Sequence, residues 1–396
     1  MKKLNKAVIM ILLFGVIIFY STNIFASNEL SIDAKAGLIV ETNTGKVIYD
    51  KDACDKNYPA SVTKILTAII VIENCNLDEK ATVTKSAISS IPAGYIVVPL
   101  TEGEEIKVIE LLYALMLKSA NDAAYVLAEH VAGSIENFSD MMNKKAEEIG
   151  CKNSHFVNPN GIHNSNHYTT AYDMFLISNY AIKNETFLKI VGKDKYVLQA
   201  TNKYPNKNRV MENTNGFINP NSKYYNEYVK GIKTGTTIQA GNCLITDVSK
   251  DGLNFINVVL GAKTSDSKFS ETKKMIEYEL ENYELNTLHK KGDIIKEIEV
   301  KKATKQTKNL KIVISDNITV MNNKSSQEQL TPNITLNDDF TAPISKGQEL
   351  GTIEYTVHDI KYSAKLIAEN DVVRSYFVEL IILGAIVMVV RKCSSY

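Results

Sequence analysis

The 396-residue sequence has no tryptophan, few prolines and no excess of charge of either sign. Lysine plus arginine and aspartate plus glutamate number 45 each, so the net charge offers no attraction to nucleic acid. The five cysteines are scattered, and no two of them have zinc-ligand or redox C-x-x-C spacing. We therefore expect no nucleic-acid partner, no metal site and no cofactor.

The N-terminus has the layout of a secretory signal peptide, which we assign to residues 1–26. Lysines near the start precede an apolar run at 7–20, and small residues follow at 25–27. An uncleaved anchor is the alternative, but the run is shorter than the ~20 residues that a membrane span needs. The sequence thus predicts export.

The C-terminus carries a second apolar segment, at residues 372–390. It contains only two charged residues, Arg374 and Glu379, and the basic pair Arg391 and Lys392 follows it. Basic residues beside an apolar helix tend to stay cytoplasmic, so we expect a membrane anchor that holds the chain at the outer face of the cell membrane. A core helix is the alternative, but it would be apolar on every face. The sequence leaves open whether the segment spans the bilayer, which we favour, or lies in the interface.

Between these ends, local patterns predict two domains. Residues 28–285 mix helical and strand patterns, which indicates an α+β fold with an antiparallel sheet covered by helices. Residues 292–370 consist of short alternating runs between turn residues, which indicates a small all-β domain. In the first domain, the expected helices are 61–74, 108–132 with a break at 119–122, 137–149, 171–182 and 271–283, and the expected strands are 37–40, 46–49, 242–247 and 253–261. In the second, the expected strands are 294–300, 310–314, 318–320, 334–336, 350–353 and 355–357.

Three short motifs follow one another in the first domain. S-V-T-K occupies 61–64, S-A-N occupies 119–121 and K-T-G occupies 233–235. The S-x-x-K spacing alone is weak evidence, because it recurs at 265–268 and 270–273. Context distinguishes the first copy: it opens a helix after a hairpin, the second motif follows at a helix break, and the third lies beside a predicted strand.

These residue types suit acyl transfer through a serine. Residues three apart share a helix face, so Lys64 can reach the Ser61 hydroxyl. Serine is a poor nucleophile until a base removes its proton, and a lysine is a base only when burial or a nearby cation, here Lys233, lowers its pKa. A helix N-terminus also supplies N–H groups that can stabilise an oxyanion at Ser61.

The other two motifs supply groups for a peptide substrate. Ser119 offers a hydroxyl that can relay a proton, and Asn121 offers an amide that can hold the peptide. Lys233, with the hydroxyls of Thr234 and Thr236, forms a cationic donor cluster suited to a terminal carboxylate. A carboxypeptidase needs such a cluster.

Longer stretches extend the pattern: YPAS at 58–61, LKSANDAA at 117–124, HFVNPNG at 155–161 and GIKTGT at 231–236. The three motifs are a signature shared by penicillin-binding proteins and class A β-lactamases. Together with these stretches, they make the chain resemble the D-alanyl-D-alanine carboxypeptidases, which are low-molecular-mass penicillin-binding proteins. The β-rich module and the apolar tail also fit the layout of that family. Ala120 departs from it, since many members have glycine there, but alanine is also small.

The resemblance implies a penicillin-binding/β-lactamase-like catalytic domain. Such an enzyme removes the terminal D-alanine from peptidoglycan pentapeptides through an acyl-enzyme, and β-lactam antibiotics inhibit it by acylation. The implied roles are nucleophile for Ser61, general base for Lys64, second-motif pair for Ser119 and Asn121, carboxylate binding for Lys233 with Thr234 and Thr236, and oxyanion donors for the backbone N–H groups of Ser61 and Thr236.

Several other residues have two interpretations. His163 and His167 are four apart, as in a zinc-binding helix, but they follow a turn sequence and form no H-E-x-x-H motif, so hydrogen bonding within a loop is favoured. Cys243 is either a packed thiol, which we favour, or a reactive one. Residues 213–215 form either a structural loop or a substrate contact. The cysteines at 54, 75, 151 and 243 either include a disulfide of undetermined pairing or stay free.

Other functions remain open on the same residues. A β-lactamase or an endopeptidase could use this scaffold, but a class A β-lactamase needs a glutamate for deacylation, and no E-x-x-L-N lies between the second motif and Lys233. A receptor that binds wall peptide without turnover would not need an intact Ser61 and Lys64 pair. The carboxypeptidase is therefore the preferred function.

Overall fold

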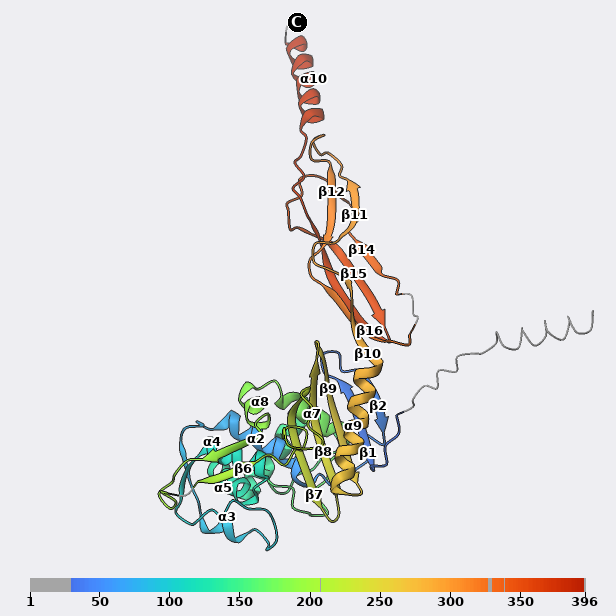
Figure 1. Cartoon of the computed structure of the whole chain (residues 1–396). Helices are drawn as coiled ribbons and strands as arrows, with labels where there is room; N and C mark the ends of the chain where they lie inside the picture. Colours follow the sequence, from blue (N-terminus) through green and yellow to red (C-terminus); the bar gives the residue numbers. More distant parts are fainter. Residues whose placement is uncertain (1–29, 207, 327–329, 338, 395–396) are drawn as a thin grey trace, which may run out of the picture.

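The computed structural model describes residues 30–394 except 207, 327–329 and 338. The predicted signal peptide, residues 1–26, lies outside the described residues. Figure 1 shows an N-terminal domain of helices around a sheet, a narrower β domain beyond it, and a helix at the far end.

The N-terminal domain is built on a five-stranded antiparallel sheet in the order β2-β1-β9-β8-β7. Its strands are β1 (Ala36–Glu41), β2 (Val47–Lys51), β7 (Val229–Thr237), β8 (Gly241–Lys250) and β9 (Leu253–Ala262). Two small two-stranded antiparallel sheets accompany it, β3 (Lys80–Thr82) with β4 (Glu105–Lys107) and β5 (Lys195–Leu198) with β6 (Arg209–Glu212). The expected α+β class with an antiparallel sheet is confirmed.

Helices cover both faces of this sheet (Figure 1). They are η1 (Ala60–Thr63), α2 (Lys64–Asn74), α3 (Lys85–Ser89), α4 (Val108–Tyr113), η2 (Ala114–Lys118), α5 (Asn121–Ala132), α6 (Ile135–Ile149), α7 (Ala171–Ala181), α8 (Glu185–Val191) and α9 (Ser265–Asn282). Along β1, Leu38 and Val40 pack into the larger core with α2 and its neighbours, while Ile39 packs into a second core with α9. Because both faces are buried, β1 is apolar at consecutive positions and does not alternate.

Local chemistry explains where the helices begin and end. The break expected at 119–122 is real: η2 ends at Lys118, Ser119 has a left-handed φ of 61°, and α5 begins at Asn121. The helix expected at 271–283 begins earlier, at Ser265. Thr264 and Ser267 form a reciprocal capping box there, which satisfies the first free N–H groups of α9.

The second domain is all-β, as expected. Its sheet has the order β11-β12-β16-β15-β14, and a separate pair joins β10 to β13. The strands are β10 (Tyr283–His289), β11 (Ile294–Glu299), β12 (Asn309–Ile314), β13 (Ile318–Asn323), β14 (Asn333–Leu336), β15 (Glu349–Val357) and β16 (Ile360–Ala368).

The strands of the β domain differ from the sequence predictions at three points. The runs 350–353 and 355–357 belong to one strand, β15, which is continuous because it pairs along its length with β16. The polar strand β16 was not predicted, since only a few of its residues face the core. The segment between the two predicted domains is itself largely a strand, β10, which follows α9 directly and pairs with β13.

The tail forms α10 (Phe377–Cys393), which lies at the end of the molecule farthest from the N-terminal domain (Figure 1). Large apolar side chains project from it into solvent: Ile381, Ile382, Leu383, Ile386, Val387, Met388, Val389 and Val390. No helix among the described residues has both the length and the apolarity that crossing a membrane requires. The predicted span is thus not found in the described part of the chain.

Candidate active site

The three sequence motifs meet at an open cleft of about 460 Å³. Ser61 lies in η1, Ser119 follows η2, Asn121 begins α5 and Thr236 lies on β7 at the sheet edge. The cleft is lined by Ser61, Ala93, Gly94, Tyr95, Ile96, Ser119, Asn121, Gly161, Ile162, Thr236, Thr237 and Ile238. Of the other predicted site residues, Lys64, Lys233 and Thr234 are buried and do not line this cleft.

The amine of Lys64 is the centre of the hydrogen-bond network. Its Nζ lies 2.9 Å from Ser61 Oγ, 3.0 Å from Asn121 Oδ1 and 2.8 Å from the carbonyl oxygen of Asn160. A neutral amine has two N–H groups and one lone pair. The amide and carbonyl oxygens can only accept, so they take the two N–H groups, and the lone pair is left facing the Ser61 hydroxyl.

The surroundings of Lys64 favour that neutral form. The side chain is completely buried, and burial lowers its pKa well below the usual value of a lysine. The charge of Lys233 lowers this pKa further, and the carboxylate of Asp122 opposes the shift. The sequence had identified Lys233 as the cation that would act in this way.

The pKa of Lys233 is lowered to about 7, because burial and then the charge of Lys268 disfavour its protonated form. Its Nζ donates to the carbonyl oxygen of Thr234 at 3.0 Å. Because the charge of Lys233 lowers the pKa of Lys64, a protonated Lys233 favours the neutral form of Lys64 that can act as a base. Lys268 lies on α9, and the sequence motifs give it no role beyond the repeated S-x-x-K spacing at 265–268.

The turn that presents Ser61 is held by a chain of polar contacts. Ala60 has a left-handed φ of 48°, which costs energy for a non-glycine residue and needs support from its surroundings. The Val157 N–H donates to His167 Nδ1 at 3.2 Å, so Nε2 carries the proton and donates to Thr63 Oγ1 at 2.9 Å. Thr63 Oγ1 then donates to the Ala60 carbonyl oxygen at 2.9 Å. Burial lowers the pKa of His167 to about 3, which keeps the imidazole neutral for this role.

Two glycines allow the surrounding segments to approach this turn. A Cβ on Gly161 would lie 1.8 Å from the Ala60 carbonyl oxygen, and one on Gly235 would lie 2.9 Å from the Ser61 nitrogen. The second distance means that β7 passes directly beside the backbone N–H of the serine. Both glycines belong to the stretches that carried the family resemblance, and their close approach is the physical reason for them there.

The second motif closes the other side of the cleft. The left-handed backbone at Ser119 turns the chain from η2 into α5, and its side chain faces the cleft. Asn121 accepts from Lys64 and donates from Nδ2 to the Ile96 carbonyl oxygen at 2.9 Å. Both ends of this amide have partners, so its predicted contact with substrate stays a prediction. Asp122, which is not a predicted site residue, accepts from the N–H groups of Val98 and Leu100 and so holds the segment that follows the cleft residues 93–96.

The remaining threonines of the third motif differ in exposure. The hydroxyl of buried Thr234 is hydrogen-bonded to that of Thr214 at 2.7 Å. Thr236 is exposed at the cleft and donates to Asn242 Oδ1 at 3.0 Å. Segment 213–215 is therefore a loop that supports β7, and none of its residues lines the cleft.

The other open questions are answered by geometry. His163 packs edge-on against the Tyr58 ring with centroids 4.6 Å apart, and His167 is committed to the hydrogen-bond chain, so the loop role is favoured for both. The described cysteines, Cys54, Cys75, Cys151 and Cys243, are all free. Cys243 is a packed thiol, and burial raises its pKa to about 11, which suppresses the reactive thiolate.

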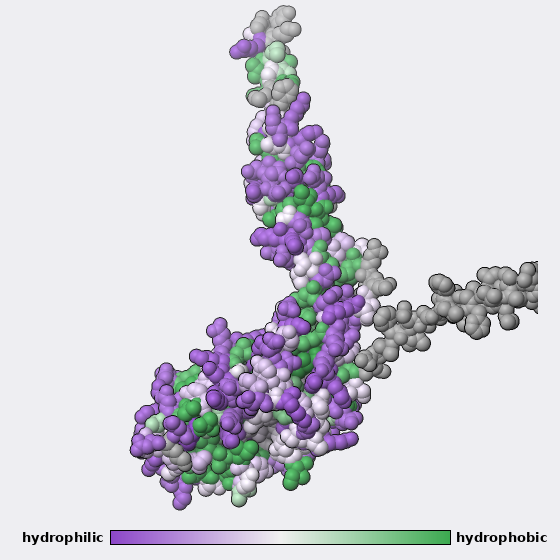
Figure 2. Space-filling view, viewed as in Figure 1, coloured by the Kyte–Doolittle hydropathy of each residue, from purple (hydrophilic) through white to green (hydrophobic). Residues whose placement is uncertain are grey.

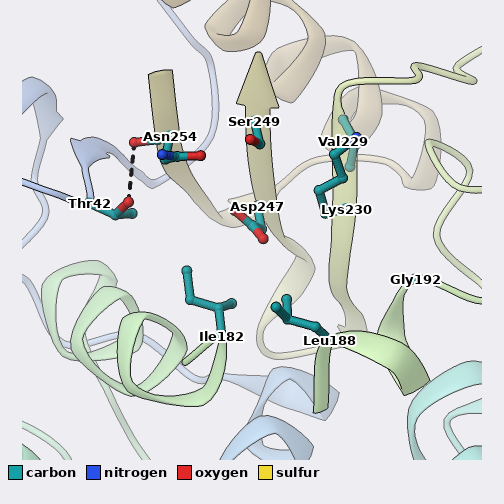
Figure 3. A pocket seen from close by; sticks show the side chains of 9 residues that line it. All are labelled: Thr42, Ile182, Leu188, Gly192, Val229, Lys230, Asp247, Ser249 and Asn254. Atoms are coloured by element: carbon teal, nitrogen blue, oxygen red, sulfur yellow. Dashed lines mark hydrogen bonds between the residues drawn. The ribbon is translucent and has the colours of Figure 1, made fainter. Parts of the chain in front are cut away.

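A second cavity, of about 520 Å³, lies at the opposite end of the sheet and holds none of the motif residues. Figure 3 shows Asp247 and Lys230 on neighbouring strands above the apolar side chains of Ile182 and Leu188. This cavity contains Ser249, but no lysine amine within hydrogen-bond distance of it is recorded among the described residues. The chemistry therefore belongs to the cleft at Ser61.

Comparison with known proteins agrees with this geometry. The profile of the D-alanyl-D-alanine carboxypeptidases matches residues 23–264. The chain belongs to the D-alanyl-D-alanine carboxypeptidase family. The profile of the C-terminal domain of penicillin-binding protein 5 matches residues 283–374, which include most of the β domain. This membership confirms the predicted resemblance and the serine-type carboxypeptidase class.

Relatives and solved structures extend over most of the chain. D-alanyl-D-alanine carboxypeptidase DacF of Bacillus subtilis is 33% identical over 371 residues, covering 92% of this chain and 90% of the relative. DacC of Escherichia coli is 30% identical over 351 residues, covering 86% and 84%. Penicillin binding protein 5 from Haemophilus influenzae has 26% identity and a TM-score of 0.65, with 87% of this chain and 98% of that chain covered. A peptidoglycan synthesis regulatory factor (PBP3) from Streptococcus pneumoniae has 25% identity and a TM-score of 0.71, with 86% and 100% covered.

The close approach of Gly161 to the serine turn can be tested against a matched control. Gly161 and Gly133 both have left-handed backbones, with φ of 82° and 78°, but only Gly161 has no room for a methyl group. Gly133→Ala should cost only the strain of that backbone, about 1–2 kcal/mol, and leave the rate of penicillin acylation unchanged. Gly161→Ala should displace Ala60 and reduce the rate of penicillin acylation by at least about ten-fold. This loss should be seen at a temperature at which the variant is still folded. Equal acylation rates in the two folded variants would contradict this account.

Proposed function

We propose that the protein removes the terminal D-alanine from peptidoglycan stem pentapeptides through an acyl-enzyme on Ser61, and that β-lactams acylate the same serine. The observation that carries the proposal is the 2.9 Å contact between the Ser61 hydroxyl and the buried Lys64 amine at an open cleft. Membership in the family supports the substrate class.

In the acylation step, the neutral Lys64 amine takes the proton of Ser61 as Oγ bonds to the carbonyl carbon that precedes the terminal D-alanine. The carbon–nitrogen bond to that D-alanine then breaks, and the proton passes to its nitrogen. Ser119 lines the same cleft, so its hydroxyl suits the relay between Lys64 and the leaving nitrogen. Water subsequently hydrolyses the ester and restores Ser61.

The backbone N–H groups of Ser61 and Thr236 are the proposed oxyanion donors. Gly235 supports this pairing, because its lack of a side chain lets β7 run beside the Ser61 nitrogen. Donors fixed in this way need no reorganisation as negative charge develops on the carbonyl oxygen, which is the usual source of a large rate gain.

Lys233 is the proposed source of positive charge for the substrate carboxylate. The exposed Thr236 hydroxyl is the proposed direct donor at the cleft, and it exchanges its bond to Asn242 Oδ1 for one to the carboxylate. Lys233 lies beneath the cleft surface, so its charge acts over a short distance through a poorly solvated region. Thr234 is buried, and its hydroxyl is hydrogen-bonded to that of Thr214. Because a hydroxyl both donates and accepts, Thr234 can accept from Thr214 while it donates to the carboxylate.

The lining of the cleft also bears on the competing functions. No aspartate or glutamate is among the residues that line it in the described part of the chain, so no carboxylate is placed to activate water as in a class A β-lactamase. We therefore expect β-lactam adducts to persist. A receptor without turnover is disfavoured, because a buried lysine held against a serine is a costly arrangement without a catalytic role.

We further propose that the protein is exported and attached to the outer face of the cell membrane through α10. The support is the row of exposed apolar side chains along this helix, visible as the apolar surface near the tip in Figure 2, and Arg391 directly after them.

The assignment of the nucleophile predicts a single site of modification. Penicillin should label Ser61, and neither Ser265 nor Ser270 of the repeated S-x-x-K spacing, because these two lie on α9 outside the cleft. Peptide mapping by mass spectrometry after labelling measures this directly. Ser61→Ala should abolish labelling, and an adduct at either serine of α9 would overturn the assignment.

The pKa of Lys233 predicts how activity depends on pH. Below about pH 7 Lys233 is protonated and can bind a carboxylate, so kcat/KM for a free-acid peptide should fall as pH rises through about 7. The same peptide amidated at its C-terminus should show no such fall. Lys233→Ala removes the positive charge beneath the cleft and should lower kcat/KM for the acid by about ten-fold or more, which corresponds to about 1.4 kcal/mol, and should affect the amide far less.

Lys268→Gln provides the matched control. This substitution removes the cation that, after burial, lowers the pKa of Lys233. The fall of kcat/KM for the free-acid peptide should therefore move to higher pH. Lys233→Ala could instead lower kcat/KM equally for the acid and amide peptides and shift only the rising limb of the pH–rate profile. That result would show that Lys233 acts mainly by keeping Lys64 neutral.

Membrane attachment is tested separately from catalysis. A chain that ends at Tyr376 lacks α10 and should move from the membrane fraction to the soluble fraction while it keeps its rate of penicillin acylation. Retention of the shortened protein in the membrane fraction would contradict attachment through α10 and leave the catalytic proposal untouched.

A further inference from the structure

Away from the cleft, three side chains with metal-binding atoms converge on one point of the surface. They are Cys75, Glu79 and His130, and their thiol, carboxylate and imidazole atoms all lie within 4.8 Å of one another. The Nε2 of His130 is 2.9 Å from Glu79 Oε1, so these two atoms already face each other. We propose that these residues form a binding site for a zinc ion.

The donor set favours zinc over the other common cations. A thiolate, an imidazole and a carboxylate are the three protein ligand types of zinc, whereas calcium and magnesium take oxygen ligands. In a tetrahedral site with bonds of about 2.0–2.3 Å, the ligand atoms lie roughly 3.3–3.6 Å apart. The three ligand atoms lie within 4.8 Å of one another, and His130 Nε2 is only 2.9 Å from Glu79 Oε1. Rotation of the partly exposed side chains of Glu79 and His130 can bring all three atoms to tetrahedral spacing. The fourth position would be left to water.

The position of the site in the fold gives an independent reason for a cation there. Cys75 is the C-terminal cap of α2, and its N–H donates to the Val71 carbonyl oxygen at 3.0 Å. His130 lies in the last turn of α5. The carbonyl ends of two helices thus meet at this point, and each carries partial negative charge that stabilises a cation.

The same two helices hold the catalytic residues at their other ends. Lys64 begins α2 and Asn121 begins α5, and the two side chains are hydrogen-bonded to each other at 3.0 Å. A zinc ion at Cys75 and His130 would therefore tie together the far ends of the helix pair that carries the base. Binding requires the thiolate, so the metal displaces the thiol proton of Cys75 to solvent.

Cobalt is the probe that reports on the thiolate. The full chain is reduced, stripped of metal with a chelator and titrated with Co²⁺, and a near-ultraviolet thiolate-to-cobalt charge-transfer band should appear and then vanish as Zn²⁺ is added. Cys75→Ser should abolish this band, and His130→Gln should weaken Zn²⁺ binding by more than about ten-fold, since even residues that only support a ligand cost 10–100-fold. Cys54→Ser, at an exposed cysteine outside the cluster, should bind as the parent does.

Stability and catalysis provide further readouts. Zn²⁺ should raise the melting temperature of the parent protein and of Cys54→Ser but not of Cys75→Ser, because a ligand that binds only the folded state stabilises it. Penicillin acylation should proceed without added metal, so the inference stands apart from the proposed function. A cobalt band that persists in Cys75→Ser, or no band in the parent protein, would show that Cys75, Glu79 and His130 contact one another without holding a metal ion.

Discussion

Lys64 places an amine where water does not reach it, and much of the N-terminal domain is arranged to satisfy that one group. An unpaired charge at this depth would cost several kcal/mol, so the amine must either find partners or lose its proton. It does both: the Asn121 amide and the Asn160 carbonyl take its N–H groups, and burial with Lys233 nearby disfavours the charged form. The only acidic hydrogen left beside its lone pair is that of Ser61.

The supporting structure follows from this requirement. The carbonyl of Asn160 can reach Lys64 because Gly161 lets its loop lie against the serine turn, and Thr67 Oγ1 donates to the neighbouring Pro159 carbonyl at 2.6 Å. His167, held neutral by burial, braces the turn from behind. The Asn160 and Pro159 carbonyls lie in a loop. Because backbone carbonyls in a loop do not take part in helix or strand hydrogen bonds, they are free to accept from side chains such as Lys64 and Thr67.

Burial is the main cause that lowers the pKa of both buried lysines, Lys64 and Lys233, and a neighbouring positive charge adds to it in each case. Lys268, on the far side of the sheet in α9, lowers the pKa of Lys233, and Lys233 in turn lowers that of Lys64. The sheet therefore transmits an electrostatic effect from one of its faces to the other. The site depends on α9 although no residue of α9 lines the cleft.

Much of this could be predicted from the sequence, because the signals are local. The α+β class, the break at Ser119 and the Ser61 and Lys64 pair follow from apolar periodicity, turn residues and a spacing of three on a helix. The length of β15 and the existence of β16 were not predictable in this way, since pairing between strands decided them.

Only the tertiary structure decided which distant groups meet. The Asn160 carbonyl, the His167 brace and the charge of Lys268 carry no sequence signature, because a backbone oxygen, a lone histidine and a helix lysine are common everywhere. Cys75, Glu79 and His130 have no metal-ligand spacing, yet the packing of α5 against α2 brings their ligand atoms within 4.8 Å. Spacing along the chain reports contacts within one helix or turn, whereas contacts between elements depend on how their buried faces pack, which the order of residues does not display.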